Sequence, residues 1–269
     1  MKDKRILYVS SEVIPYLPET EISSMSFEAP RIVNNNNGQI RIFMPRYGNI
    51  NERRHQLHEV IRLSGMNMVI NDLDMPLIIK VASIPKERMQ VYFIDNEDYF
   101  KRKATFADED GKLFPDNDER AIFFAKGVIE TVKKLNWSPD IIHVHGWLAS
   151  FLPLYLRNYY GTEPLFENSK IVTSVYNQGF EGTLDEKTID KILYDALEEE
   201  AVEELKVPSY VNLMKIAVKN SDAAIIGSEE IPEELAAYLE TLDIPVLKYQ
   251  KPEDVEPALL DFYKTKVLD

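Results

Sequence analysis

Short apolar runs alternate along this chain with longer amphipathic stretches, beginning with Arg5–Ser10 (RILYVS). Short runs that are rich in Val and Ile and bounded by Gly, Pro, Asn or Asp are typical of buried strands. The pattern predicts strands or strand-rich segments at Arg5–Ser10, Gln39–Met44, Met68–Ile84, Gln90–Ile94, Ile141–Val144, Lys170–Val175, Ala223–Ile226 and Val246–Lys248.

The amphipathic stretches carry a helical signal. In Asp116–Leu135 the apolar residues Ala121, Phe124, Val128 and Val132 recur at helical spacing, which makes this the clearest helix. Further helices are predicted at Ile22–Val33, Gly146–Tyr159, Asp185–Leu205, Ser209–Asn220, Pro232–Leu239 and Pro252–Lys264. Strands that alternate with helices predict an α/β fold, with a mainly parallel sheet and helices on both of its faces.

The last predicted helix carries an apolar stripe made by Val255, Leu259 and Phe262. Such a stripe must pack against the rest of the protein, so this helix is expected to close the fold. The chain contains no internal repeat and no low-complexity linker. We therefore expect residues 1–269 to form a single domain.

Charge is distributed unevenly along the chain. The formal net charge is −14, and residues 181–269 hold 22 acidic and 9 basic side chains. An acidic surface repels nucleic acid and anionic lipid, so we expect neither as a partner. The chain has no cysteine, no long apolar signal segment and no stretch that could span a bilayer. These features predict a cytoplasmic protein without membrane association.

Candidate chemistry centres on a pair of histidines in Ile141–Trp147 (IIHVHGW). His143 and His145 alternate along a predicted strand, so their side chains share a face near the carboxyl end, where open α/β sheets bind ligands. The pair could contact a sugar hydroxyl or a phosphate, or could be hydrogen-bonded packing at a strand end, and the spacing favours packing. A metal site would need further ligands that the sequence does not identify, so we predict no metal.

The first strand is not followed by a nucleotide-binding motif. Residues 8–25 (YVSSEVIPYLPETEISSM) lie where many nucleotide-binding α/β proteins carry a glycine-rich turn, but they contain no glycine. The chain also lacks a Walker loop and the elbow motif of serine hydrolases. We predict no bound cofactor, and these residues alone assign no reaction.

Several longer motifs resemble the N-terminal, acceptor-side domain of bacterial glycogen synthases and plant starch synthases. Phe43–Gly48 (FMPRYG) matches the family's MPRYG, and Pro139–Leu156 (PDIIHVHGWLASFLPLYL) is similar to its segment PDIIH-x-HDWQTAL-x-P-x-YL. Arg5–Pro15, Val91–Lys103 and Ala107–Arg120 also resemble family segments, in the same order along the chain, and Asn212–Lys215 and Ser221–Ser228 fit later segments more loosely. The resemblance implies a Rossmann-like fold, one half of a two-domain glycosyltransferase that transfers glucose from ADP-glucose to an α-1,4-glucan.

The resemblance breaks down at the loop that binds the sugar-nucleotide donor. Where the family reads KTGGL, this chain has Pro18, Glu19, Thr20, Glu21 and Ile22. The lysine that would offset phosphate charge is absent, and so are the glycines that would let backbone amides approach the donor. Pro18 offers no N–H, and Glu19 and Glu21 would repel a pyrophosphate. We interpret this donor loop as degenerate.

Other family motifs have changed too. The family's HDW is His145-Gly146-Trp147 here, and the histidine of its HN-x-AYQG is replaced by Tyr176. The resemblance implies that His145, Trp147, Tyr176 and Asn177 occupy vestigial or glucan-binding positions, because aromatic faces and amides suit sugars. Packing beneath the former active site is an equally good interpretation of these residues. We assign no catalytic residue.

The family's C-terminal domain supplies most of its sugar-nucleotide contacts, and it has no counterpart in these 269 residues. We therefore expect a glycogen synthase-like protein of glucan metabolism that is inactive alone and keeps a glucan-binding or synthase-regulating role. Its partners would be an α-glucan or oligosaccharide, a full-length synthase or another protein. Two alternatives stay open: a glucosyltransferase completed by a separate nucleotide-domain chain, and a pure protein-interaction module.

Overall fold

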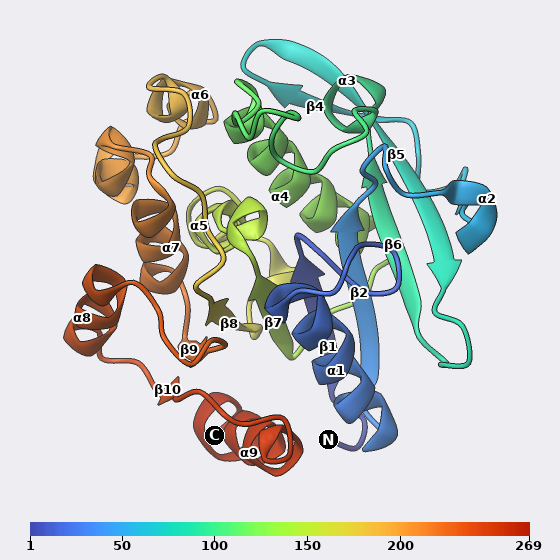
Figure 1. The fold of residues 1–269 in the computed structure, drawn as a ribbon, viewed down its shortest axis with the longest axis vertical. Coiled ribbons are helices and arrows are strands. Elements are labelled where there is room, and N and C mark those ends of the chain that lie inside the picture. The colour runs from blue at the N-terminus through green and yellow to red at the C-terminus, as the bar shows by residue number, and fades with distance from the viewer.

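The computed structural model describes residues 1–269, and a ten-stranded sheet lies at its centre (Figure 1). The strand order is β10-β9-β8-β7-β1-β2-β6-β5-β3, and β4 pairs with β5 off this path. Neighbouring strands from β10 to β6 are parallel, and the pairs that involve β5 are antiparallel. The predicted α/β fold with a mainly parallel sheet is therefore confirmed.

Every predicted strand is present. The strands are β1 (Arg5–Ser10), β2 (Gln39–Pro45), β3 (His58–Glu59), β4 (Met66–Ile70), β5 (Leu73–Ser83), β6 (Gln90–Asp95), β7 (Ile141–His145), β8 (Lys170–Val175), β9 (Ala223–Ile226) and β10 (Val246–Leu247). The strand-rich segment Met68–Ile84 is a hairpin that turns at Asn71 and Asp72. These two residues have φ of 48° and 64°, as the tight turns of two-residue hairpins require.

Helices cover both faces of the sheet. The α-helices are α1 (Glu21–Asn35), α2 (Glu52–His55), α3 (Glu97–Phe100), α4 (Asn117–Lys134), α5 (Phe151–Asn158), α6 (Thr188–Leu193), α7 (Tyr210–Lys219), α8 (Glu233–Thr241) and α9 (Val255–Phe262). The 3₁₀ segments are η1 (Trp147–Ala149), η2 (Pro164–Phe166) and η3 (Glu199–Lys206), and the π-helical segment η4 (Tyr263–Val267) continues α9. Helix α1 packs on α9, while α4, α5, α7 and α8 pack in succession on the other face, as right-handed crossovers require.

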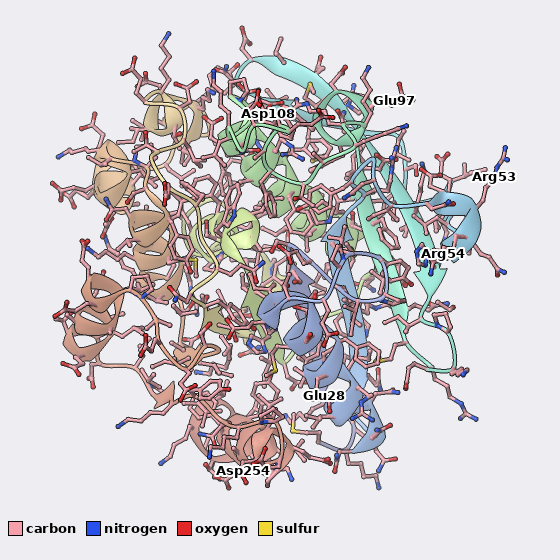
Figure 2. All side chains as sticks on the ribbon, in the orientation of Figure 1. Glu28, Arg53, Arg54, Glu97, Asp108 and Asp254 are labelled. Carbon is pink, nitrogen blue, oxygen red and sulfur yellow. The ribbon has the colours of Figure 1, made fainter.

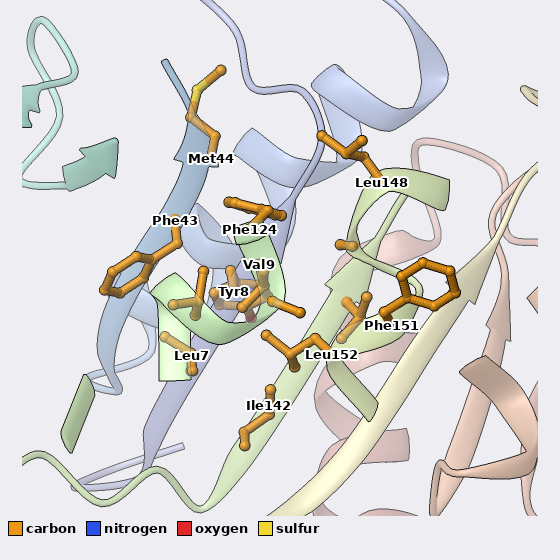
Figure 3. Packing of buried hydrophobic residues seen from close by; sticks show 14 of the residues in the cluster. Leu7, Tyr8, Val9, Phe43, Met44, Phe124, Ile142, Leu148, Phe151 and Leu152 are labelled. Atoms are coloured by element: carbon orange, nitrogen blue, oxygen red, sulfur yellow. The ribbon is translucent and has the colours of Figure 1, made fainter. Parts of the chain in front are cut away.

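The central strands are buried on both faces (Figure 3). Leu7 and Val9 of β1 point to the face covered by α4 and α5, where Phe124 joins the same core. Tyr8 points to the opposite face, and its hydroxyl donates a hydrogen bond to the Ala29 carbonyl of α1. Strands covered on both faces are near-continuously apolar, which explains why these runs were recognisable in the sequence.

Charged side chains occupy the periphery. Arg53, Arg54, Glu97 and Asp254, labelled in Figure 2, are exposed on the outer helices and loops, whereas Glu28 of α1 is half-buried and pairs with Arg31. No helix combines the length and apolar character that a membrane crossing needs.

Two predicted helices differ from the observed ones. The prediction of one helix at Asp185–Leu205 was wrong, because Ala196 adopts a left-handed φ of 59° and separates α6 from η3. The stretch Gly146–Tyr159 divides into η1 and α5. Pro153 lacks an N–H, which is tolerated best in the first turn of a helix, and α5 begins two residues before it at Phe151.

Candidate functional site

The carboxyl ends of β1, β7 and β8 lie next to each other in the sheet, because β7 pairs in parallel with both other strands. In this register Ser10 lies opposite His145, and His145 lies opposite Ser174. The side chains at these ends, together with those of the loops that follow them, form what we call the strand-end site. It lies at the edge of the sheet where open α/β folds bind ligands.

The two histidines of β7 are buried members of a polar network. Their rings lie 4.0 Å apart, as alternation along one strand predicts. His143 Nδ1 lies 2.6 Å from the hydroxyl oxygen of Tyr263, and His143 Nε2 lies 2.7 Å from that of Ser174. His145 Nδ1 lies 2.7 Å from the hydroxyl oxygen of Tyr176, while His145 Nε2 has no hydrogen-bond partner.

Burial sets the protonation state of both imidazoles. Desolvation lowers the pKa of His145 to about 3, and desolvation together with the neighbouring His145 lowers the pKa of His143 well below its ordinary value. Both rings are therefore neutral near pH 7, so neither adds positive charge that would attract a phosphate.

The other two predicted site residues, Trp147 and Asn177, closely follow the ends of β7 and β8 along the chain. Trp147 is buried, and its ring centroid lies 4.8 Å from that of Phe106 and 4.9 Å from that of Phe180. Asn177 is exposed, and its backbone N–H donates to Ser228 Oγ at 2.8 Å. The structure thus joins His145 to Tyr176 directly, buries Trp147 against Phe106 and Phe180 and leaves only Asn177 open to solvent.

A hollow of about 510 Å³ opens over Trp147, and we call it the aromatic hollow. Phe106, Trp147 and Phe180 supply its aromatic wall, and Asn49 and Glu181 supply polar groups. Such a mixture of ring faces with amide and carboxylate groups is suited to a neutral, hydroxyl-rich ligand.

The donor loop forms the start of α1. Thr20 is the N-cap: its Oγ1 accepts from the Ser23 N–H at 3.0 Å, and Ser23 Oγ accepts in return from the Thr20 N–H at 2.8 Å. Pro18 and Glu19 are exposed, whereas Ile22 is buried. The chain's own side chains therefore satisfy amides of a helix N-terminus that could otherwise bind an anion.

Two carboxylates tie this helix start to the strand-end site. Glu12 is buried, and its carboxylate accepts from Thr20 Oγ1 at 2.7 Å and from Gln178 Nε2 at 2.9 Å. Desolvation by burial raises the pKa of Glu12, and the hydrogen bonds from Thr20 and Gln178 oppose this only in part. Glu21 accepts a hydrogen bond from Ser228 Oγ, which links α1 to the loop after β9. This corner of the site is thus acidic.

Gly146 occupies a position that leaves no room for a side chain. Its φ is 80°, and a Cβ placed there would lie 2.0 Å from Ser11 Oγ. An aspartate at this position, as in HDW, would meet both a strained backbone and a direct clash. The HGW motif therefore fits this backbone, and HDW does not.

Sequence reasoning missed several residues of the site. They are Glu12, Gln178, Ser228, Phe106 and Phe180. Their position just after strand ends, or in loops that follow them, was the available signal for Glu12, Gln178 and Ser228. Nothing local marks Phe106, because its place beside Trp147 depends on a contact across the fold. No group of three or more His, Asp or Glu side chains is arranged to hold a metal ion.

Comparison with known proteins relates the chain to one family. The starch synthase catalytic domain family matches residues 5–243. The glycogen synthase of Chlorobium limicola is 39% identical over 190 residues, which cover 70% of this chain and 39% of that protein. The glycogen synthase of Chlorobaculum tepidum is 34% identical over 250 residues, which cover 91% of this chain and 49% of that protein. The chain thus spans about half the length of these relatives, or less.

A solved structure with the same fold is the catalytic domain of Starch Synthase IV from Arabidopsis thaliana bound to ADP and acarbose. The TM-score is 0.71 at 15% sequence identity, and the match covers 94% of this chain and 53% of that one. At this level of identity the likeness concerns the fold.

Proposed function

This chain belongs to the starch synthase catalytic domain family, and we propose that it binds an α-glucan at the strand-end site without binding a sugar nucleotide at the start of α1. In this proposal the isolated chain does not transfer glucose, and it acts in glucan metabolism by binding the polymer or by regulating a synthase. The observation that carries the proposal is the start of α1 itself: Thr20 caps the Ser23 amide and Glu21 lies in the first turn, at the place where the family resemblance implies a donor phosphate.

The donor side argues for loss of nucleotide binding. A helix N-terminus binds phosphate when free backbone N–H groups and positive charge face it. Here the Thr20 side chain takes up the Ser23 amide, and Glu19 and Glu21 add negative charge where a lysine would be needed. Pro18 removes a further donor. A pyrophosphate at this place would meet repulsion instead of a binding pocket.

The acceptor side keeps groups that suit a sugar. The aromatic hollow presents Phe106 and Phe180 beside the polar Asn49 and Glu181. A ring face can cover the C–H face of a pyranose, while amide and carboxylate oxygens accept from its hydroxyls. Relatives named glycogen synthase, and a solved starch synthase bound to ADP and acarbose, support an α-glucan as the ligand to test.

Calorimetric titration tests both halves of the proposal. We expect maltoheptaose to bind the purified chain and ADP-glucose to give no heat of binding. Phe180→Ala should remove binding in the aromatic hollow. Phe27→Ala is the matched control, because Phe27 is also half-buried but lies on α1 outside the hollow.

The outcomes separate cleanly. Binding of ADP-glucose, or glucose transfer from it to a glucan, would contradict the donor half and reopen the glucosyltransferase alternative. Maltoheptaose binding that Phe180→Ala leaves unchanged would contradict the assignment of the hollow. Absence of any maltoheptaose binding would contradict the acceptor half and favour a protein-interaction role.

A further inference from the structure

A second, larger groove lies away from the strand ends. Its volume is about 790 Å³, and we call it the tyrosine groove. One wall is formed by residues 66–69 of β4, the floor by Lys126 and Glu130 of α4, and the other wall by Tyr159, Tyr160 and the residues just after α6. None of these residues takes part in the aromatic hollow.

Exposed apolar surface is concentrated at this groove. Six large hydrophobic residues of the chain are well exposed: Ile61, Val69, Leu73, Tyr159, Tyr194 and Val207. Three of them line the groove, and a fourth, Leu73, lies in the same hairpin as its β4 wall. Tyr159 is 46% exposed and Tyr194 is 51% exposed, so about half of each side chain is open to a ligand. Exposed rings gathered in one concavity indicate a binding surface.

The charges in the groove are already paired. Lys126 Nζ lies 2.6 Å from Asp195 Oδ1 and donates to the Val69 carbonyl at 2.8 Å. Asp195 also accepts from the hydroxyl of Tyr155 at 2.7 Å, and Glu130 pairs with Lys133 at 3.0 Å. No unpaired cation is available to bind a phosphate or a carboxylate, so the chemistry does not fit an anionic ligand.

The β4 wall does not favour an added peptide strand. Asn67 lies opposite Pro76, which has no N–H, so the Asn67 and Val69 backbone groups point away from β5 and into the groove. The Val69 carbonyl already accepts a hydrogen bond from Lys126. A docking strand would therefore have to displace the buried Lys126–Asp195 ion pair. Lys126 reaches this strand edge from α4 and so fills one of the acceptors that an added strand would need.

We propose that the tyrosine groove is a second oligosaccharide-binding site, which takes a stretch of neutral sugar units independently of the strand-end site. Tyr159 and Tyr194 stack on pyranose rings, and the backbone and side chain of Asn67 and the carboxylate of Glu130 bind hydroxyls. The inference rests on the proposed function for its choice of an α-glucan as ligand. Two separate sites would let one chain hold a branched or long glucan at two points.

The test is a titration of the whole chain with maltoheptaose, analysed for the number of sites. We expect two sites per chain. The double variant Tyr159→Ala/Tyr194→Ala should lose the groove site, with affinity weakened about tenfold or more. The variant Tyr159→Phe/Tyr194→Phe keeps both ring faces and should keep two sites. Thermal unfolding of each variant checks that the fold is retained.

The two proposals fail in different ways. If the chain binds one maltoheptaose, and Phe180→Ala abolishes it while the tyrosine double variant does not, the groove inference is overturned and the proposed function stands. If the tyrosine double variant abolishes the single site and Phe180→Ala does not, the groove stands and the strand-end assignment fails. Two sites that both survive in the tyrosine double variant overturn the groove inference.

Discussion

Burial decides the charge of the two strand-end histidines. His143 and His145 are fully enclosed, so each stays neutral in the folded chain at a pH where the unfolded chain would bind a proton. The sequence predicted their shared face and favoured packing over ligand contact. It did not reveal their partners, because Tyr263 lies 120 residues away from His143 and reaches it only in the fold.

The difference in proton binding between the folded and unfolded states predicts that acid destabilises the protein. The native pKa of His145 is lowered to about 3, so below the ordinary histidine pKa of about 6.5 the unfolded state binds more protons and stability falls as pH falls. The free energy of unfolding therefore rises with pH below pH ~6. Replacing His145 with Asn should lower the slope of this dependence by about 1.4 kcal/mol per pH unit. Urea unfolding at several pH values measures it. An unchanged slope in His145→Asn would contradict burial of His145 as its cause.

A second residue-scale prediction concerns Gly146. The variant Gly146→Asp should destabilise the protein through both its φ of 80° and the clash with Ser11 Oγ. Gly182→Asp is the matched control, because Gly182 has the same φ of 80° but no atom within 4 Å of a Cβ. We expect Gly146→Asp to cost about 1–3 kcal/mol more than the control, the range of overpacking in a filled interior. Equal losses in chemical denaturation would show that the Ser11 contact is readily relieved.

At the scale of elements, strands were easier to predict than the interruptions between helices. Continuous apolar runs in the sequence predict buried strands such as β7 and β8. The break at Ala196 comes from a left-handed φ of 59° at an alanine, a residue type that does not mark such a turn in the sequence. The short elements α2 and β3 were missed because they contain too few residues to show the hydrophobic periodicity of a helix or a strand. Salt bridges from Glu52 to Arg46 and Lys80 hold α2 against the sheet instead.

The start of α1 gives an element-scale prediction. Thr20 caps the helix and also donates to the buried Glu12 carboxylate, so Thr20→Ala should cost about 1 kcal/mol for the cap. A further loss of about 1–3 kcal/mol follows because a buried acceptor is left short of a donor. Ser209→Ala at the start of α7 is the control, since Ser209 caps a helix without contacting a buried carboxylate. Urea midpoints that match in the two variants would argue against the Glu12 contact.

At the scale of the whole molecule, the segment after the family match completes the fold. Residues 244–269 lie beyond the matched range of 5–243, yet they add β10 to the sheet and pack α9 on α1. The sequence predicted a closing helix from its apolar stripe. It did not predict that the π-helical turn after α9 would insert Tyr263 beside His143 under the strand-end site.

This connection makes the final turn of the chain a support for the distant site. Tyr263 is fully buried, and its hydroxyl lies 2.6 Å from His143 Nδ1 and 3.4 Å from the Tyr8 hydroxyl. Tyr263→Phe should lower the free energy of unfolding by about 1–3 kcal/mol, because it leaves a buried ring nitrogen without a partner. Tyr249→Phe, at a half-buried tyrosine in the same segment, should change it by less than about 0.5 kcal/mol. Chemical denaturation measures both, and equal values would mean that the segment packs on the sheet without holding His143 in place.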